Sequence, residues 1–70
     1  MTKVIQEHGY YIVDELGRFH SEGDEPTISI DNYIDIVEDV EGNITENPIL
    51  GYKAWYNHGE FIRSERNVWQ

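Results

Sequence analysis

Three glycines divide this chain into short segments, and their pattern restricts the fold more than any other feature. Each glycine precedes one residue of variable type and then a large apolar residue, as in Gly17-Arg18-Phe19, Gly42-Asn43-Ile44 and Gly59-Glu60-Phe61. Glycine adopts positive φ angles at no steric cost, and the surrounding β-branched and aromatic residues favour strands. The pattern therefore predicts three tight turns, each joining the two strands of a β-hairpin.

The first strands of these hairpins are expected at residues 10–13, 33–37 and 52–56, and the return strands at 18–20, 43–45 and 60–63. Residues 27–30, which follow Pro26, are a further expected strand. These segments predict a mainly β fold, a small antiparallel meander of short hairpins. A chain of this length has room for a single small domain, which we expect to span residues 1–70.

An α+β fold with one or two short helices is the alternative, with helices at about 31–41 and 48–58. Apolar residues from Ile30 to Val40 fall at helical spacing, and Pro48 and Gly59 suit the beginning and end of a second helix. Acidic residues at the end of the first segment oppose the helix dipole, however, and Gly51 disfavours the second helix.

The charge of the chain is concentrated in its middle. The sequence has 14 acidic and 5 basic residues, a formal net charge of −9, and no basic residue lies between Phe19 and Tyr52. That interval also contains many apolar residues, so we expect the charge to be carried by folded structure and not by a disordered tail. The candidate acidic binding face consists of Glu22, Asp24, Glu25, Asp31, Asp35, Glu38, Asp39, Glu41 and Glu46.

This charge excludes several classes of partner. Duplex affinity depends on Lys and Arg displacing counterions from the phosphates, so we expect no direct nucleic-acid binding, and no membrane binding. A compact chain of this length has a radius of gyration of about 11 Å, so nine negative charges on one side of it would have about half the linear charge density of DNA. The absence of cysteine and of long apolar runs leads us to expect a soluble, cytoplasmic protein.

Catalysis, cofactors and metals are not expected. His8, His20 and His58 lie far apart in sequence and do not show the spacing of a zinc site, so we interpret them as turn or rim residues. A hydrolase with two catalytic carboxylates needs a cleft that shifts one pKa, and 70 residues provide little material to form its walls.

Aromatic residues supply a second set of candidate contacts. Adjacent residues on a strand point to opposite faces, so the neighbouring pairs Tyr10-Tyr11 and Trp55-Tyr56 cannot both be buried on one side of a single sheet. One member of each pair is available for an interface, unless terminal segments cover both faces. The candidate aromatic contacts are Tyr11, Trp55, Tyr56 and Trp69.

Part of the chain resembles a repeat of small bacteriophage proteins, in which a "WYLNG" turn is followed by "KLHREDGPA". The segment that carries the resemblance is Gly17-Arg18-Phe19-His20-Ser21-Glu22-Gly23-Asp24-Glu25-Pro26-Thr27, with further copies at residues 42–49 and from 55 onward. The resemblance implies a chain of short β-hairpins in the manner of MORN-type repeats, a phage origin and an interaction role without catalytic residues. Here the turn glycines are unevenly spaced, and Ser21 and Thr45 replace basic residues of the repeat.

Two functional hypotheses follow from the charge and the resemblance. The first is an acidic phage-type protein that binds a basic surface of a host protein, such as a nucleic-acid-binding or defence enzyme, and inhibits or modulates it through DNA-mimic-like charge complementarity. The alternative is a non-inhibitory adaptor or self-assembling module, including a homodimer, that uses exposed strand edges, with the acids serving solubility.

Overall fold

The computed structural model describes residues 1–69, and within them the chain forms seven β-strands and no helix. The strands are β1 (Thr2–Gln6), β2 (Gly9–Val13), β3 (Ile28–Ile30), β4 (Tyr33–Glu38), β5 (Ile44–Ile49), β6 (Tyr52–Asn57) and β7 (Glu60–Arg66). The prediction of a mainly β fold of short antiparallel hairpins is confirmed. The helices considered at about 31–41 and 48–58 are wrong, because strand pairing satisfies the backbone of both segments.

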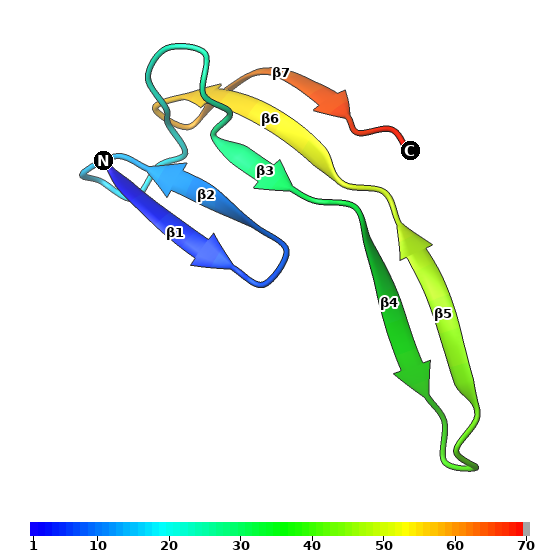
Figure 1. Ribbon diagram of the computed structural model, residues 1–70. Coiled ribbons are helices and arrows are strands. Elements are labelled where there is room, and N and C mark those ends of the chain that lie inside the picture. The colour runs from blue at the N-terminus through cyan, green and yellow to red at the C-terminus, as the bar shows by residue number, and fades with distance from the viewer. Residues whose placement is uncertain (70) are drawn as a thin grey trace.

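Five strands form one open antiparallel sheet, in the order β1-β2-β3-β6-β7, and β4 and β5 form a separate hairpin. The chain leaves the sheet after Ile30 and returns at Tyr52, and these two residues lie opposite each other in the sheet. The hairpin of residues 33–49, which we call the arm, extends away from the sheet (Figure 1).

The three expected turns are present at Gly17, Gly42 and Gly59, which have φ angles of 77°, 85° and 88°. His58 precedes Gly59 with a φ of 45°, so the two-residue turn between β6 and β7 has positive φ at both positions, as a type I′ turn requires. This turn twists in the same sense as its strands, which favours the long hairpin of β6 and β7. The pairing of the two strands has one register shift, between Trp55 and Tyr56.

Some strand boundaries differ from the expectation. Thr2–Gln6 was not expected as a strand but pairs along its whole length with β2. The expected return strand at residues 18–20 is reduced to a single bridge between Val13 and Phe19. β5 continues through Pro48, which lies opposite Ile34 and is tolerated in a strand that has only one neighbour.

The core is small and is divided between the two faces of the five-stranded sheet: Ile12 and Trp55 lie on one face, and Ala54, the neighbour of Trp55 on β6, lies on the second face. Its buried apolar residues are Ile12, Ala54 and Trp55. The loop between β2 and β3 covers this core: the indole Nε1 of Trp55 donates a hydrogen bond to the carbonyl of Asp24 (3.1 Å). Thr27 is fully buried, and its Oγ1 accepts the backbone N–H of Tyr56 (2.9 Å), so the loop is attached to β6 by side-chain as well as backbone bonds.

The molecule is elongated. Its Cα radius of gyration is 15.2 Å and its extents are 46 × 26 × 16 Å, whereas a compact chain of this length has a radius of gyration of about 11 Å. The compact shape assumed from the sequence is therefore wrong, and the cause is the arm, which leaves the sheet instead of packing on it (Figure 1).

Candidate functional site: an acidic arm

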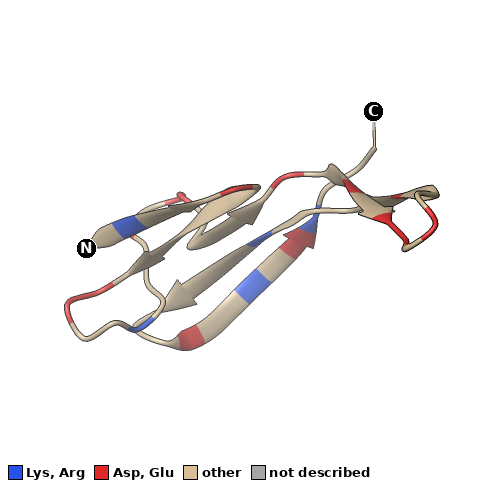
Figure 2. Ribbon diagram, turned by 90° about the horizontal axis from the view of Figure 1, so that it is seen from below, with Lys and Arg blue, Asp and Glu red and all other residues tan. Residues whose placement is uncertain are grey.

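The arm carries more than half of the net charge of the protein. It contains five acidic residues and no lysine or arginine, and all five bases of the chain lie on the five-stranded sheet and its connections (Figure 2). The acids are Asp35, Glu38, Asp39, Glu41 and Glu46, and all of them are exposed.

Aliphatic side chains accompany these acids on the arm. The register places Ile34 opposite Pro48, Ile36 opposite Glu46, and Glu38 opposite Ile44, and these six side chains share one face of the hairpin. Ile36 and Ile44 are 63% and 65% exposed. One face of the arm thus combines an apolar strip with two carboxylates, a composition typical of an interaction surface.

Two asparagines fix the arm where it joins the sheet. The side chain of Asn32 accepts the backbone N–H of Gly51 (2.7 Å) and donates to the carbonyl of Val68 (3.0 Å). The side chain of Asn67 donates to the carbonyl of Ile30 (2.9 Å), and its backbone N–H donates to the carbonyl of Gly51 (3.0 Å). The two strands that enter and leave the arm are therefore held at both sides of the joint.

The base of the arm also rests on the turn between β1 and β2. The ring of His8 stacks on that of Tyr33, with centroids 3.7 Å apart and planes 3° from parallel. The backbone N–H of Asp31 donates to the carbonyl of His8 (2.7 Å). This explains the position of Asp31, a predicted contact residue that lies at the joint and not on the arm.

Asp39 shapes the turn at the tip of the arm. Its carboxylate accepts the backbone N–H groups of Asn43 (3.0 Å) and Glu41 (2.8 Å) and the side-chain amide of Asn43 (3.2 Å). These bonds, that of the Asn43 N–H first, hold the pKa of Asp39 below its ordinary value. Asp39 is thus occupied within the turn, and the other four acids of the arm are better placed to contact a partner.

The nine predicted acids do not form one face. Five lie on the arm and Asp31 lies at its joint, whereas Glu22, Asp24 and Glu25 lie in the loop that covers the core, beyond the other end of β3 (Figure 1). The ammonium of Lys3 is 2.6 Å from the carboxylate of Glu25, so part of that second group is paired. A single acidic face was expected because the acids are contiguous in sequence, but β3 lies between the two groups and places them at its opposite ends.

The predicted aromatic contacts have different environments. Trp55 is only 8% exposed and its ring is covered by the guanidinium of Arg63, 3.7 Å from the ring centroid, so it is a core residue and is not available to a partner. Tyr11 and Tyr56 are half-buried, and each contacts the ring of Phe19. Trp69 is 51% exposed.

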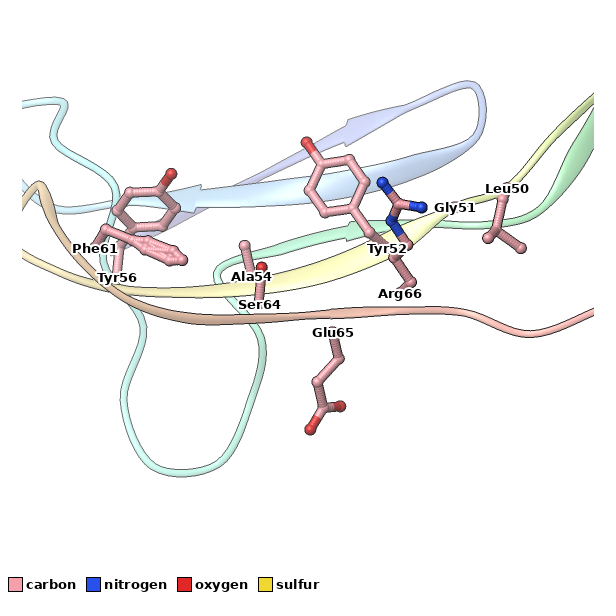
Figure 3. Close-up of a pocket in the computed structure, with 9 residues that line it drawn as sticks. All are labelled: Leu50, Gly51, Tyr52, Ala54, Tyr56, Phe61, Ser64, Glu65 and Arg66. Atoms are coloured by element: carbon pink, nitrogen blue, oxygen red, sulfur yellow. The ribbon is translucent and has the colours of Figure 1, made fainter.

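The second face of the sheet carries an open hollow beside β6 and β7. Tyr52, Tyr56 and Arg66 project to this side, and Glu65 projects to the other (Figure 3). The hollow has a volume of about 550 Å³, and Phe61, 50% exposed, forms part of its wall. It is shallow and wide, which suits a protein contact better than an enclosed small molecule.

A cluster around Asp14 escaped the interpretation of the sequence. The buried carboxylate of Asp14 accepts hydrogen bonds from Nδ1 of His58 (2.7 Å) and Nε of Arg18 (2.9 Å). It also accepts hydrogen bonds from the backbone N–H groups of Leu16 and Arg18. The rings of His58 and His20 stack at 3.9 Å, and the Nδ1 of His20 accepts the N–H of His58 (3.1 Å). The cluster joins two turns that are 44 residues apart in sequence, and its one signal in the sequence is the Asp-x-x-Gly pattern at residues 14–17.

These bonds make the stability of the fold depend on pH. The hydrogen bond from His58, followed by those from the Arg18 and Leu16 N–H groups, lowers the pKa of Asp14 strongly, although burial opposes the shift. An unfolded Asp has a pKa of about 4. Because the folded pKa is lower, the stability that Asp14 provides is fully present above about pH 5 and is lost as the pH falls through and below 4.

We therefore expect Asp14→Asn to lower the midpoint of thermal unfolding at neutral pH, and the difference from the wild type to shrink as the pH falls from about 6 to about 2. The control is Asp35→Asn, since the described residues give that carboxylate no hydrogen bond. Calorimetry across this range checks the prediction. A difference that stays constant with pH would contradict it.

Comparisons of the chain with protein-family models, with curated proteins and with solved structures found no match. Residues 1–69 include no helix with the length and hydrophobicity of a membrane span. Within the same residues, no three His, Asp or Glu side chains are grouped so that they could hold a metal ion.

Proposed function

We propose that this chain acts by binding and not by catalysis: the arm docks on a basic surface of a host protein and thereby inhibits or modulates it. The observation that carries the proposal is the arm itself, five acids and several exposed aliphatic residues without a single base, held away from the sheet. The resemblance to phage repeat proteins supports a host protein as the target and the host-cell cytoplasm as the place of action.

The shape of the arm suits a groove better than a flat surface. A strand of six residues is about 20 Å long, and a two-stranded hairpin is narrow. Grooves that bind nucleic acid are lined by Lys and Arg, and their potential attracts an acidic element over a long range. A nucleic-acid-binding or defence enzyme is therefore the proposed class of target, and the aliphatic strip of the arm supplies contact area once the charges have met.

The exposed apolar surface of the arm also favours binding to a partner. Two strands without further cover are only marginally stable in water, and here one face exposes Ile34, Ile36 and Ile44. Binding removes this apolar surface from water. The alternative proposal, a non-inhibitory adaptor or self-assembling module, is favoured by a different observation, the open outer edges of β1 and β7.

The experiment compares two variants with the same change in net charge. In the arm variant, Asp35, Glu38, Glu41 and Glu46 are replaced by lysine, and Asp39 is kept because it shapes the turn. In the control variant, four exposed acids outside the arm are replaced by lysine: Glu7, Glu15, Glu22 and Asp24. Each protein is used to capture binding proteins from a bacterial lysate, and the affinity for the captured protein is then measured.

We expect the wild type and the control variant to capture the same basic protein, and the arm variant to bind it about 10- to 100-fold more weakly, because each exposed charge pair contributes up to about 1 kcal/mol. If the arm variant binds as well as the wild type, the arm is not the binding element. If both variants lose binding equally, net charge and not the arm is responsible, which also contradicts the proposal.

A further inference from the structure

We propose that two copies of this chain pair along the outer edge of β7, as antiparallel strands with Ser64 of one copy opposite Ser64 of the other. The proposal concerns a surface that the arm does not use, so it does not depend on what the arm binds. The result is a ten-stranded sheet that continues from one copy into the next.

The outer edge of β7 is open within residues 1–69. β7 is the last strand of the sheet, and all seven of its residues are exposed. In an antiparallel ladder, residue pairs that exchange backbone hydrogen bonds alternate with pairs that do not. The backbone N–H of Asn67 donates to the carbonyl of Gly51, so Gly51–Asn67 is a bonded pair. Lys53–Glu65 is then also a bonded pair, and the N–H and C=O groups of Ser64 and Arg66 point outward from the sheet.

The charges of β7 select one register for this pairing. With Ser64 opposite Ser64, the outward backbone groups of the two serines bond to each other, and Arg63 of each copy faces Glu65 of the other. Arg63 and Glu65 fall in a non-bonded pair, where side chains lie closest together. Both side chains project from the same face, as their own contact of 2.5 Å within one chain shows, and both are about half exposed.

Neighbouring registers are unfavourable. If the register of the two β7 strands moves to the next alignment in one direction, Arg63 lies opposite Arg63. In the other direction, Glu65 lies opposite Glu65. Both are closely spaced pairs. Opposite charges attract across a strand pair and like charges repel, so the edge of β7 is self-complementary in one alignment. The side chains at positions 63 and 65 thus attract the second copy and also fix the register of the pairing.

The other open edges do not have this property. On β1 the only charged residue is Lys3, and this strand has no acidic residue that a second copy could place opposite it. The strands of the arm carry acids alone, Asp35 and Glu38 on β4 and Glu46 on β5, so two arms repel each other. Of the strand edges in the described part of the chain, β7 is the one on which acids and bases alternate in a self-complementary order.

The pairing also separates the acidic arms. β7 runs toward the joint of the arm, where Asn67 contacts Gly51 and Ile30 (Figure 1). An antiparallel partner therefore has its arm at the opposite end of the shared sheet. The repulsion between the two most acidic parts is reduced by distance and by salt, and a dimer presents two arms that point away from each other.

The test is the mass of the particle in solution, measured by sedimentation over a concentration series up to about 1 mM, the range of a weak dimer. We expect the mass to rise from 8.2 kDa toward twice that value for the wild type. Glu65→Arg places arginine opposite Arg63 at two symmetric positions, and we expect it to weaken the dimer about 10- to 100-fold.

The double variant Arg63→Glu with Glu65→Arg restores opposite charges across the pair and is expected to restore the dimer. Circular dichroism of each variant establishes that the sheet is folded. If the wild type stays a monomer at every concentration, the proposal is wrong. If Glu65→Arg dimerises as well as the wild type, or the folded double variant does not regain the dimer, association uses another surface and the β7 pairing is likewise overturned.

Discussion

Replacing Trp55 by alanine is expected to lower the free energy of unfolding by about 3–5 kcal/mol, the usual cost of deleting a large aromatic side chain from a core. Trp55 is 8% exposed, bonds the loop that covers the core through the carbonyl of Asp24, and lies under the guanidinium of Arg63. In a chain of fewer than about 80 residues, a single hydrophobic core rarely supplies more than about 3–5 kcal/mol of stability. We therefore expect a large unfolded population at 25 °C, seen as lost strand signal in circular dichroism and as a lower midpoint in urea.

The chain offers a matched control in Trp69, which is 51% exposed. Trp69→Ala is expected to change the free energy of unfolding by less than about 0.5 kcal/mol. Trp55→Phe keeps most of the buried ring and loses the N–H donor, so its cost should lie between those of the two alanine variants. Equal costs for Trp55→Ala and Trp69→Ala would show that the core is not centred on Trp55.

Gly51→Ala is expected to cost about 3 kcal/mol and to displace the arm from its joint. A Cβ atom at this position would lie 1.9 Å from the carbonyl oxygen of Ile30 and 2.6 Å from the carbonyl carbon of Asp31, both of them backbone atoms that cannot rotate away. The hydrogen bonds of Gly51 to Asn32 and Asn67 lie in the same joint. Urea unfolding measures the cost, and amide chemical shifts of residues 31–51 report the displacement.

Gly17→Ala is the comparison for this substitution. A Cβ at Gly17 meets no atom within 4 Å, but the φ of +77° remains unfavourable for alanine, at a cost of about 1–2 kcal/mol. We expect Gly51→Ala to cost more and to move the signals of the arm, whereas Gly17→Ala leaves them in place. Unchanged shifts in the arm of Gly51→Ala would contradict the close approach at the joint.

The hairpins were predictable because their causes are local. Gly17, Gly42 and Gly59 have positive φ, and the segments around them are rich in β-branched and aromatic residues, so the three turns and most of their strands followed from the sequence. β1 was not predicted because Thr2–Gln6 contains no turn glycine and little alternation. Its strand conformation comes from pairing with β2, and the residues of the segment alone do not indicate this pairing.

The separation of the arm could not be predicted either. Strand patterns indicate that a hairpin forms but not whether it pairs with the next hairpin. Here the separate position of the arm depends on the contacts of Asn32 and Asn67 at the joint. The same limit applies to Asp14, His20 and His58, which are far apart in sequence and meet only because β2 and β6 lie on either side of β3. The contiguous acids suggested one face, and the topology divided them.

The central claim is that the charges of the arm provide the binding surface, and the most direct measurement is the dependence of the dissociation constant on salt for the captured partner. Steering and attraction by exposed charges weaken as ionic strength rises, because the screening length falls from about 10 Å at 0.1 M to about 3 Å at 1 M. We predict a steep rise of the dissociation constant with salt for the wild type and for the variant with reversed acids outside the arm, and a shallow or absent rise for the arm variant. An affinity of the wild type that does not change with salt would contradict the account.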